Sequence, residues 1–310
     1  MRALSTAADL FHRARDSDIY FSFKRSKLVV VAFWVTVAIF IGALFAPWIA
    51  PHNPLDLAKL NLSDAFMPPA WNASGMAQFP IGTDDQGRDL LSAIMYGSRT
   101  SLLVGFLAVI FAMVLGITLG LIAGYVGGAV DAVIMRIADV QLSFPAILVA
   151  MLIDGVTRSL LGNDRRDNSA LVVLIVAIGL SYWVQYARTV RGSVLVEKNK
   201  EYVQAARVIG LSPALIAIRH VLPNVLGPVL VIATINLALA IITEATLSFL
   251  GVGLPPTNPS LGTLISTGQK YLFSGEWWIT IFPGLTLAIL VLAVNLLGDW
   301  LRDALNPKLR

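Results

Sequence analysis

Five stretches of this chain contain no Asp, Glu, Lys or Arg and are long enough to cross a lipid bilayer. A crossing helix needs about 20 apolar residues. Backbone groups inside lipid must form hydrogen bonds within their own segment, so runs of this length predict helices. The five runs are 28–51, 100–130, 168–187, 221–243 and 277–298, and a sixth candidate, about 132–153, carries Arg136 and Asp139 near its start. The chain is therefore expected to be an all-α integral membrane protein with six transmembrane helices.

Composition excludes the main alternatives. Charged residues make up 14% of the 310-residue chain, whereas ordinary soluble domains carry roughly a quarter. The sequence has no cysteine, which excludes a disulfide scaffold and cysteine-based zinc or catalytic sites. It lacks the alternating apolar pattern of a membrane β-barrel. The net charge of +4 is small and gives no basis for nucleic-acid binding.

The distribution of Lys and Arg predicts the orientation, because loops rich in these residues stay on the cytoplasmic side. With six crossings and a cytoplasmic N-terminus, 16 of the 23 basic residues fall on the inner side. The seven outer ones are Lys59, Arg88, Arg99, Arg158, Arg165, Arg166 and Lys270. We expect a cytoplasmic segment at 1–27, a first transmembrane helix at 28–50, and an outer loop with an interfacial helix at 51–99. A core of five transmembrane helices follows at 100–298 and includes a cytoplasmic loop at 197–224. The chain then ends in a cytoplasmic tail at 299–310.

The cytoplasmic loop carries the signals for two short helices joined by a bend. Asn199 suits a helix N-cap and Gly210 suits the residue just after a helix. Ser212 and Pro213 then suit the start of a second helix, which Pro223 is expected to end. The apolar face predicted for the first helix consists of Tyr202, Ala205, Ala206 and Ile209. By pattern alone, this hairpin fits docking to a partner protein and lying on lipid equally well.

Asp139 and Glu244 are the ionisable residues deepest in the apolar runs. Because a charge in the bilayer is costly, both should face protein or water. One interpretation is that both line a polar pathway. The other is that they lie near opposite membrane faces, Asp139 inside and Glu244 outside, and form hydrogen bonds with neighbouring residues. Their positions in the apolar runs favour the second interpretation. Glycines recur every four residues at Gly116, Gly120 and Gly124. This spacing predicts close helix contact, and packing within the chain is preferred over contact with a partner span.

Three aspartates, Asp84, Asp85 and Asp89, precede the second apolar run. They could be imagined as calcium ligands, but the ladder of alternating oxygen ligands with a distal Glu is missing. We expect instead a turn that leads into a helix, capped by Thr83 or by one of the aspartates. The apolar side of that helix, expected to lie on the outer membrane face, would consist of Leu90, Leu91, Ile94 and Met95. No metal site is predicted.

The loop at 197–224 resembles the coupling loop of permeases from ATP-binding-cassette (ABC) importers. That signature reads Glu-Ala-Ala, three residues, Gly, nine residues, Ile, one residue, Leu-Pro, and it is matched by Ala205, Ala206, Gly210, Leu222 and Pro223. Gln204 stands in place of the Glu and His220 in place of the Ile, and His at that place is similar to the peptide and nickel permease branch. Further segments similar to that branch are Gly82–Leu91 with Tyr96–Arg99, Asp131–Pro145 and Glu244–Gly253. The long outer loop after the first span resembles the C-type subunit of the two paired permeases.

The resemblance implies a type I ABC importer permease fold in a bacterial inner membrane. It implies no catalytic residue and no cofactor bound by this chain, with ATP and Mg²⁺ held by separate ATPase subunits. The chain itself has no G-x-x-x-x-G-K-[ST] loop to hold nucleotide phosphates. Implied partners are a paralogous second permease, two ABC ATPase subunits, a periplasmic or extracellular substrate-binding protein, membrane lipid and a di- or oligopeptide substrate, with a nickel chelate as the alternative cargo. The implied coupling residues are Glu201, Tyr202, Gln204, Ala205, Ala206, Arg207, Gly210, His220, Leu222 and Pro223.

Two other classes fit the sequence less well. An ion-coupled secondary transporter would need charged residues clustered at the span centres, where Asp139 and Glu244 are the only candidates. An intramembrane enzyme would need buried catalytic groups, but His12, His52 and His220 all lie outside the apolar runs, and no H-E-x-x-H motif is present.

Overall fold

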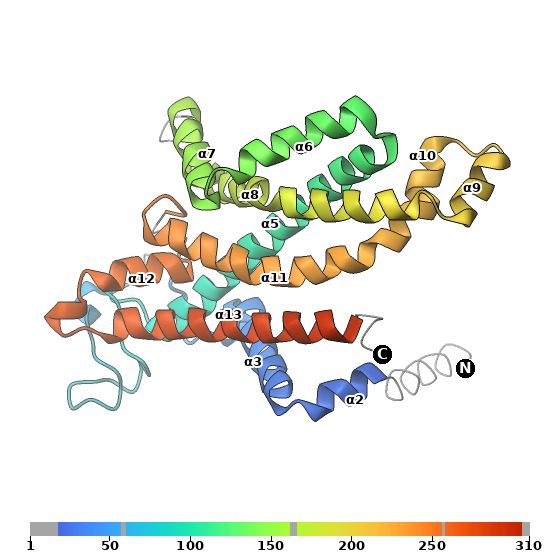
Figure 1. Ribbon diagram of the computed structural model, residues 1–310. Helices are drawn as coiled ribbons and strands as arrows, with labels where there is room; N and C mark the ends of the chain where they lie inside the picture. Colours follow the sequence, from blue (N-terminus) through green and yellow to red (C-terminus); the bar gives the residue numbers. More distant parts are fainter. Residues whose placement is uncertain (1–17, 57–59, 162–165, 256–257, 306–310) are drawn as a thin grey trace.

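The computed structural model describes residues 18–56, 60–161, 166–255 and 258–305, and every regular element in these residues is a helix (Figure 1). The one β-type contact among them is an isolated bridge between Thr83 and Asp89. The elements are α2 (Asp18–Arg25), α3 (Lys27–Leu44), α4 (Ala46–Ile49), η2 (Leu62–Asp64), α5 (Leu90–Val126), α6 (Gly128–Leu142), α7 (Ala146–Leu161), α8 (Arg166–Glu197), α9 (Glu201–Val208), α10 (Pro213–Ile216), η3 (Ala217–Val221), α11 (Leu222–Phe249), α12 (Leu261–Gln269), η4 (Leu272–Ser274) and α13 (Trp278–Leu305).

Within the described ranges, five helical segments are long and apolar enough to cross a membrane, namely α3, α5, α8, the continuous segment Pro213–Phe249 and α13. The helices α6 and α7 supply a sixth when taken together, but they meet at an angle of 95°. The sixth candidate, about 132–153, is therefore present as a bent pair of helices rather than as one straight helix. The break falls at Pro145, which lacks an amide donor and disfavours helical geometry in the residue before it. The all-α membrane fold is confirmed.

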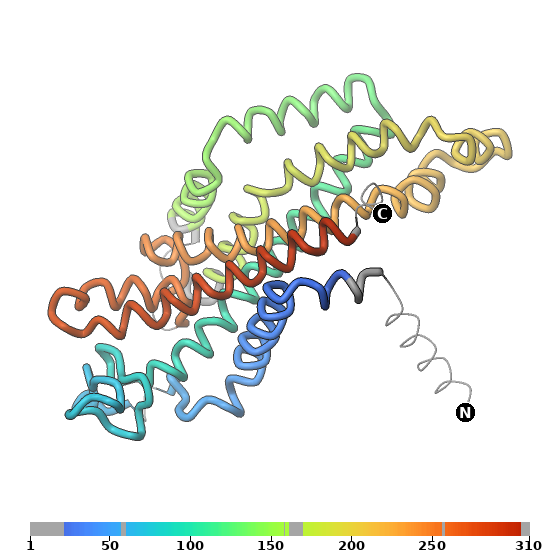
Figure 2. The backbone as a smooth tube through the Cα atoms, turned by 60° about the horizontal axis from the view of Figure 1, so that its bottom comes forward, coloured from blue at the N-terminus to red at the C-terminus, as the bar shows by residue number. Residues whose placement is uncertain are grey.

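Small residues allow α5 and α8 to pack with their backbones in contact. A Cβ atom added at Gly116 would lie 2.6 Å from the carbonyl oxygen of Trp183, and one added at Gly120 would lie 2.4 Å from that of Ala187. No larger residue fits at these positions without movement of the helices. The trace in Figure 2 shows α5 running the length of the molecule. The glycine repeat therefore packs within the chain, as preferred from the sequence.

The helix that begins before residue 100 is not a separate interfacial helix. Leu90 to Val126 form one unbroken helix of 37 residues, so that expectation is wrong. The carboxylate of Asp89 caps it by accepting a hydrogen bond from the amide of Ser92. The first crossing helix, α3, ends at Leu44, and the short α4 follows it.

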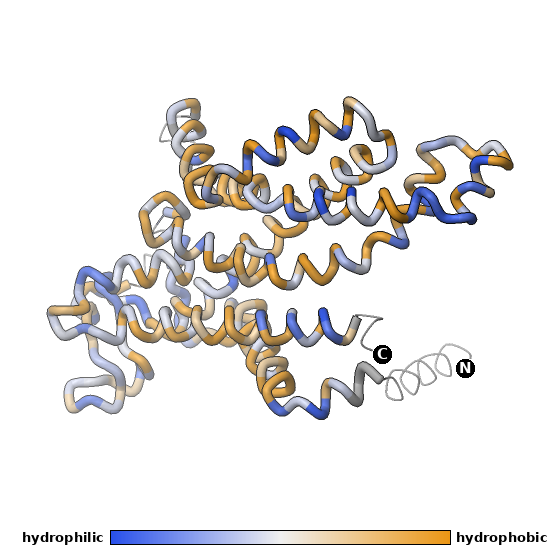
Figure 3. Tube along the Cα trace, viewed as in Figure 1, coloured by the Kyte–Doolittle hydropathy of each residue, from blue (hydrophilic) through white to orange (hydrophobic). Residues whose placement is uncertain are grey.

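The bundle has two different ends (Figure 1). We call the end with α12 and the loop between α4 and α5 the loop end, and the end with α9 and α10 the hairpin end. Phe23 of α2 and Trp300 of α13 make an edge-to-face contact with ring centroids 5.3 Å apart. Figure 3 shows polar residues gathered at both ends and apolar residues along most of the helical lengths. The predictions made for residues 1–17 and 306–310, and for Lys59, Arg165 and the side chains of Arg158 and Arg166, lie outside the described residues.

Candidate coupling site

The bend predicted at Gly210 is present and has the hydrogen bonds of a Schellman motif. Gly210 has a φ of +84°, which places it in the left-handed region. Its amide donates to the carbonyl of Arg207 at 3.0 Å, and the amide of Leu211 donates to the carbonyl of Ala206 at 3.2 Å. These two bonds satisfy carbonyls that the end of α9 would otherwise leave unpaired. Ser212 then caps α10, as expected.

The N-cap of α9 differs from the sequence-based prediction. It is Lys200, which makes no side-chain capping bond, whereas the Asn199 side chain donates to the carbonyl of Leu195. The residues of α9 that are buried against the bundle are Val203 and Ala206. Tyr202, Ala205 and Ile209 of the predicted apolar face are exposed. The Tyr202 hydroxyl also makes polar contacts with α8 and α11.

Pro223 does not end the second helix of the hairpin. The turn Ala217–Val221 is a π-helix, and α11 begins directly after it at Leu222. Pro223 thus lies at the second position of α11, just after the π-turn. The hairpin is therefore joined to α11 by one continuous helical segment.

The Tyr202 hydroxyl connects three helices at the hairpin end. It donates a hydrogen bond to Oε1 of Glu197, the last residue of α8, over 2.5 Å. It accepts one from Nδ2 of Asn224 in the first turn of α11 at 3.1 Å. Asn224 also donates to the carbonyl of His220 at 2.8 Å, and Lys200 pairs with Glu197 at 2.8 Å. Partial burial, followed by the bond to the Glu197 carboxylate, raises the pKa of Tyr202 to about 12, so the hydroxyl keeps its proton.

The hairpin is also tied to the end of α5. The ammonium group of Lys198 donates to the carbonyl of Gly124 at 2.7 Å. The guanidinium of Arg207 lies 5.8 Å from the ring centroid of Tyr125, within the range of a cation–π contact. Sequence reasoning missed Glu197, Lys198, Tyr125 and Asn224, because nothing local to these residues indicates that they meet the hairpin.

The tip of the hairpin presents apolar side chains to its surroundings. Val208 is 87% exposed and Ile209 74%, and Ile218 on the other arm is 60% exposed. Glu201, Gln204 and Ala205 are exposed as well, whereas His220 and Leu222 are half-buried and Pro223 is exposed. Nδ1 of His220 is buried and has no hydrogen-bond partner in the described part of the chain. An apolar tip of this kind is typical of a surface that a partner covers.

Asp139 and Glu244 both have local polar partners. The Asp139 carboxylate pairs with Arg188 of α8, and both side chains are about half exposed. Glu244 is fully buried and accepts hydrogen bonds from the hydroxyls of Ser101 at 2.6 Å and Ser248 at 2.7 Å. These contacts favour local bonding, and Glu244 serves to join α5 and α11.

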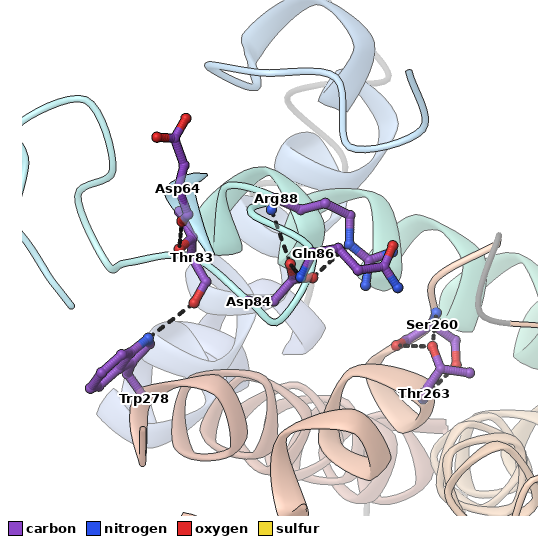
Figure 4. A network of polar contacts seen from close by, with 8 residues as sticks. All are labelled: Asp64, Thr83, Asp84, Gln86, Arg88, Ser260, Thr263 and Trp278. Carbon is purple, nitrogen blue, oxygen red and sulfur yellow. Dashed lines mark hydrogen bonds and ion pairs between the residues drawn. The ribbon is translucent and has the colours of Figure 1, made fainter. Parts of the chain in front are cut away.

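The aspartates at the loop end form a turn (Figure 4). One oxygen of the buried Asp84 carboxylate accepts hydrogen bonds from the amides of Gln86 and Arg88 at 2.9 Å each, and the other pairs with the Arg88 guanidinium. Thr83 accepts from the indole of Trp278 through its carbonyl at 3.1 Å. Among the described residues, no group of three or more His, Asp or Glu could hold a metal ion. The turn interpretation is confirmed.

The sequence matches the models of two known protein families. The model of the binding-protein-dependent transport system inner membrane component matches residues 116–310. The model of the N-terminal transmembrane domain of oligopeptide transport permease C matches residues 17–69. The first match covers the whole hairpin and the helices on both sides of it.

Curated relatives match over nearly the whole chain. The dipeptide transport system permease protein DppC of Escherichia coli strain K12 is 44% identical over 289 residues, 93% of this chain and 91% of the relative. The di/tripeptide transport system permease protein DppC of Pseudomonas aeruginosa strain UCBPP-PA14 is 38% identical over the same shares. The dipeptide transport system permease protein DppC of Haemophilus influenzae is 38% identical over 94% of this chain and 93% of the relative.

A solved structure shares the fold. It is an inward-facing conformation of the MetNI methionine ABC transporter, with a TM-score of 0.54 and 22% identity over 69% of this chain and 96% of that chain. The likeness confirms the importer permease fold expected from the sequence. The chain therefore belongs to the family of binding-protein-dependent transport system inner membrane components, on its oligopeptide permease C branch.

Proposed function

We propose that this chain forms half of the translocation pathway of an ATP-driven importer for di- or oligopeptides, and that its hairpin receives the movement of an ATPase. Support for the cargo comes from the relatives, which are named as dipeptide and di/tripeptide permeases. The observation that carries the coupling role is the Tyr202 hydroxyl, which links the hairpin to α8 and α11.

The hairpin residues divide into those that meet the ATPase and those that hold the hairpin in place. Exposed residues of α9 form the contact surface, namely Glu201, Gln204 and Ala205, with Val208 and Ile209 at the tip. Tyr202, Ala206 and Arg207 bind the hairpin to the bundle. Gly210 makes the bend, and the path through His220, Leu222 and Pro223 continues into α11.

The contacts explain how a push at the tip reaches the transmembrane helices. A rigid hairpin that is bonded to α8 at Glu197 and to α11 at Asn224 cannot move without displacing both helices. The bond from Lys198 to the end of α5 adds the third helix of the core. Since packed helices shift as units rather than bending continuously, the motion opens or closes a path between them.

The proposed role requires further partner proteins. ATP and Mg²⁺ bind two separate ATPase subunits, and this chain carries no catalytic residue. A paralogous second permease forms the other half of the pathway, and a substrate-binding protein docks at the loop end. The hairpin end and both termini face the cytoplasm of a bacterial cell, in agreement with the excess of Lys and Arg assigned to that side.

Transport in proteoliposomes tests this function. The chain is reconstituted with its second permease, its ATPases and its binding protein, and uptake of a labelled dipeptide is measured. Uptake is expected with ATP and Mg²⁺ enclosed in the vesicles, the binding protein outside, and no ion gradient. Uptake that requires a proton or sodium gradient and is unaffected by ATP would contradict the proposal. Uptake of a nickel chelate but not of peptide would contradict the proposed peptide cargo.

A further inference from the structure

An apolar groove of about 300 Å³ lies between α3 and α5 near the loop end. One face is formed by α5, where Leu102, Leu103, Phe106 and Leu107 follow one another at helical spacing. The other face is formed by Phe40 and Leu44 of α3. Most of these side chains are exposed: Leu44 by 62%, Phe106 by 54% and Leu103 by 41%.

Among the residues that the structure describes, Arg99 is the one charged residue that lines the groove. It precedes Leu102 and Leu103 by three and four residues, so it lies on the same face of α5 as the apolar side chains. The side chain is exposed, and the described part of the chain offers it no hydrogen-bond or ion-pair partner. The groove thus combines an apolar floor with a single unpaired cation.

The position of Arg99 along α5 matches the boundary of the hydrocarbon layer. The run without charges begins directly after it, at residue 100. On the neighbouring segment, α3 ends at Leu44 and Trp48 of α4 is 78% exposed, which is typical of the membrane–water interface. From Arg99 to Leu107 the helix descends about 12 Å, at 1.5 Å per residue, into the apolar layer.

We propose that this groove binds one phospholipid of the leaflet at the loop end, with its phosphate on Arg99 and an acyl chain between α3 and α5. The occupant follows from charge complementarity. An arginine fork at headgroup depth suits a phosphate diester, and the aliphatic and aromatic walls below it suit a hydrocarbon chain. A helix of a second membrane protein would cover the apolar walls but would need an acidic side chain at the height of Arg99 to pair with the guanidinium.

Native mass spectrometry of the full-length chain tests the site. The probes are dioleoyl phosphatidylglycerol and dioleoylglycerol, which share their acyl chains but differ in the phosphate. The wild type is expected to retain one phosphatidylglycerol and to bind it more tightly than dioleoylglycerol. Arg99→Gln is expected to lower the affinity for phosphatidylglycerol about tenfold, as the loss of a charge-assisted hydrogen bond does. The matched control, Arg302→Gln, removes an exposed arginine far from the groove and should change nothing.

Two further arms keep the test decisive. Leu103→Trp fills the groove but keeps Arg99, and it is expected to lower phospholipid retention as well. Because the chain has no cysteine, Leu103→Cys carries a single photoreactive label in the assembled transporter, and transfer of that label to phospholipid supports the site. Equal retention by the wild type and Arg99→Gln, equal affinity for both probes, or a cross-link from position 103 to the second permease would overturn the proposal.

Discussion

The phenol oxygen of Tyr202 lies 2.5 Å from Oε1 of Glu197, so the first helix of the hairpin is bonded directly to the last residue of α8. The two residues are five positions apart in the chain. The same oxygen accepts a hydrogen bond from Asn224, 22 residues further on. A single hydroxyl thus holds the hairpin, α8 and α11 in one arrangement, and the expected behaviour of the protein under mutation follows from it.

Removing the Tyr202 hydroxyl should weaken coupling more than assembly. Tyr202→Phe keeps the ring but loses the bonds to Glu197 and Asn224. We expect the transporter to assemble and to hydrolyse ATP, while dipeptide uptake per ATP hydrolysed falls several-fold. Parallel assays of ATPase activity and uptake in proteoliposomes measure that ratio. Tyr125→Phe, which keeps the ring beneath Arg207, is the matched control, and an equal fall in both variants would speak against a special role for Tyr202.

The bend at Gly210 should tolerate only residues that accept a left-handed backbone. A Cβ atom at Gly210 would meet no atom within 4 Å, so any penalty comes from the φ of +84° alone. Gly210→Val should cost roughly 1–2 kcal/mol in the local fold and reduce uptake without preventing membrane insertion. Gly210→Asn should be milder because Asn adopts this conformation more readily. Gly192→Val, in an open and helical position, is the control; normal uptake by Gly210→Val would count against the coupling role of the bend.

The contact of α5 with α8 should not tolerate a larger residue at Gly120. A Cβ atom at Gly120 would lie 2.4 Å from the carbonyl oxygen of Ala187. Gly120→Val should therefore destabilise the protein by about 1–3 kcal/mol through overpacking, seen as a lower melting temperature in detergent. Gly155→Val, which has open space around it, should melt near the wild-type temperature. Unchanged melting of the Gly120 variant would show that the helices do not pack this closely.

The turn before α5 should become more stable when Asp85 loses its charge. Burial, followed by the neighbouring Asp84 carboxylate, raises the pKa of Asp85 above its ordinary value of 3.8, so folding disfavours the ionised form. Ionised Asp85 therefore lowers the free energy of unfolding. This effect is absent below the ordinary pKa and grows as the pH rises through the folded-state pKa. Asp85→Asn should raise the melting temperature at pH 7, and the gain should disappear below about pH 3.8. Asp303→Asn, at an exposed position, is the control; a pH-independent gain would point to another cause.

Local signals in the sequence were sufficient for some features of the fold and the site. Gly210 and Ser212 predict the bend and the second cap because both effects depend on the backbone of a few adjacent residues. The glycine repeat predicts close packing because it leaves no side chain between two helices. The apolar runs predict the crossing segments because their length must match the bilayer.

The remaining features depend on residues far apart in the chain. Tyr202 links α9 to Glu197 of α8 and Asn224 of α11, and no periodicity within α9 identifies these partners. Pro145 breaks its span whereas Pro228 and Pro283 lie within helices, and the sequence pattern around the three does not distinguish them. Pro223 is accommodated by a π-turn, a local adjustment that the pattern of apolar residues does not predict.

The distance between the hairpin and α8 tests the central claim most directly. Ala214 of α10 and Val196 of α8, both exposed, are replaced by Cys and spin-labelled in a transporter whose partners carry no reactive cysteine. The distance between the labels is then measured with and without ATP under conditions that block hydrolysis. The account predicts one narrow distance that is the same in both states, because the hairpin and α8 move as a unit, and a broader, state-dependent distance once Tyr202→Phe is added. A distance that already changes between the two states when Tyr202 is intact would contradict it.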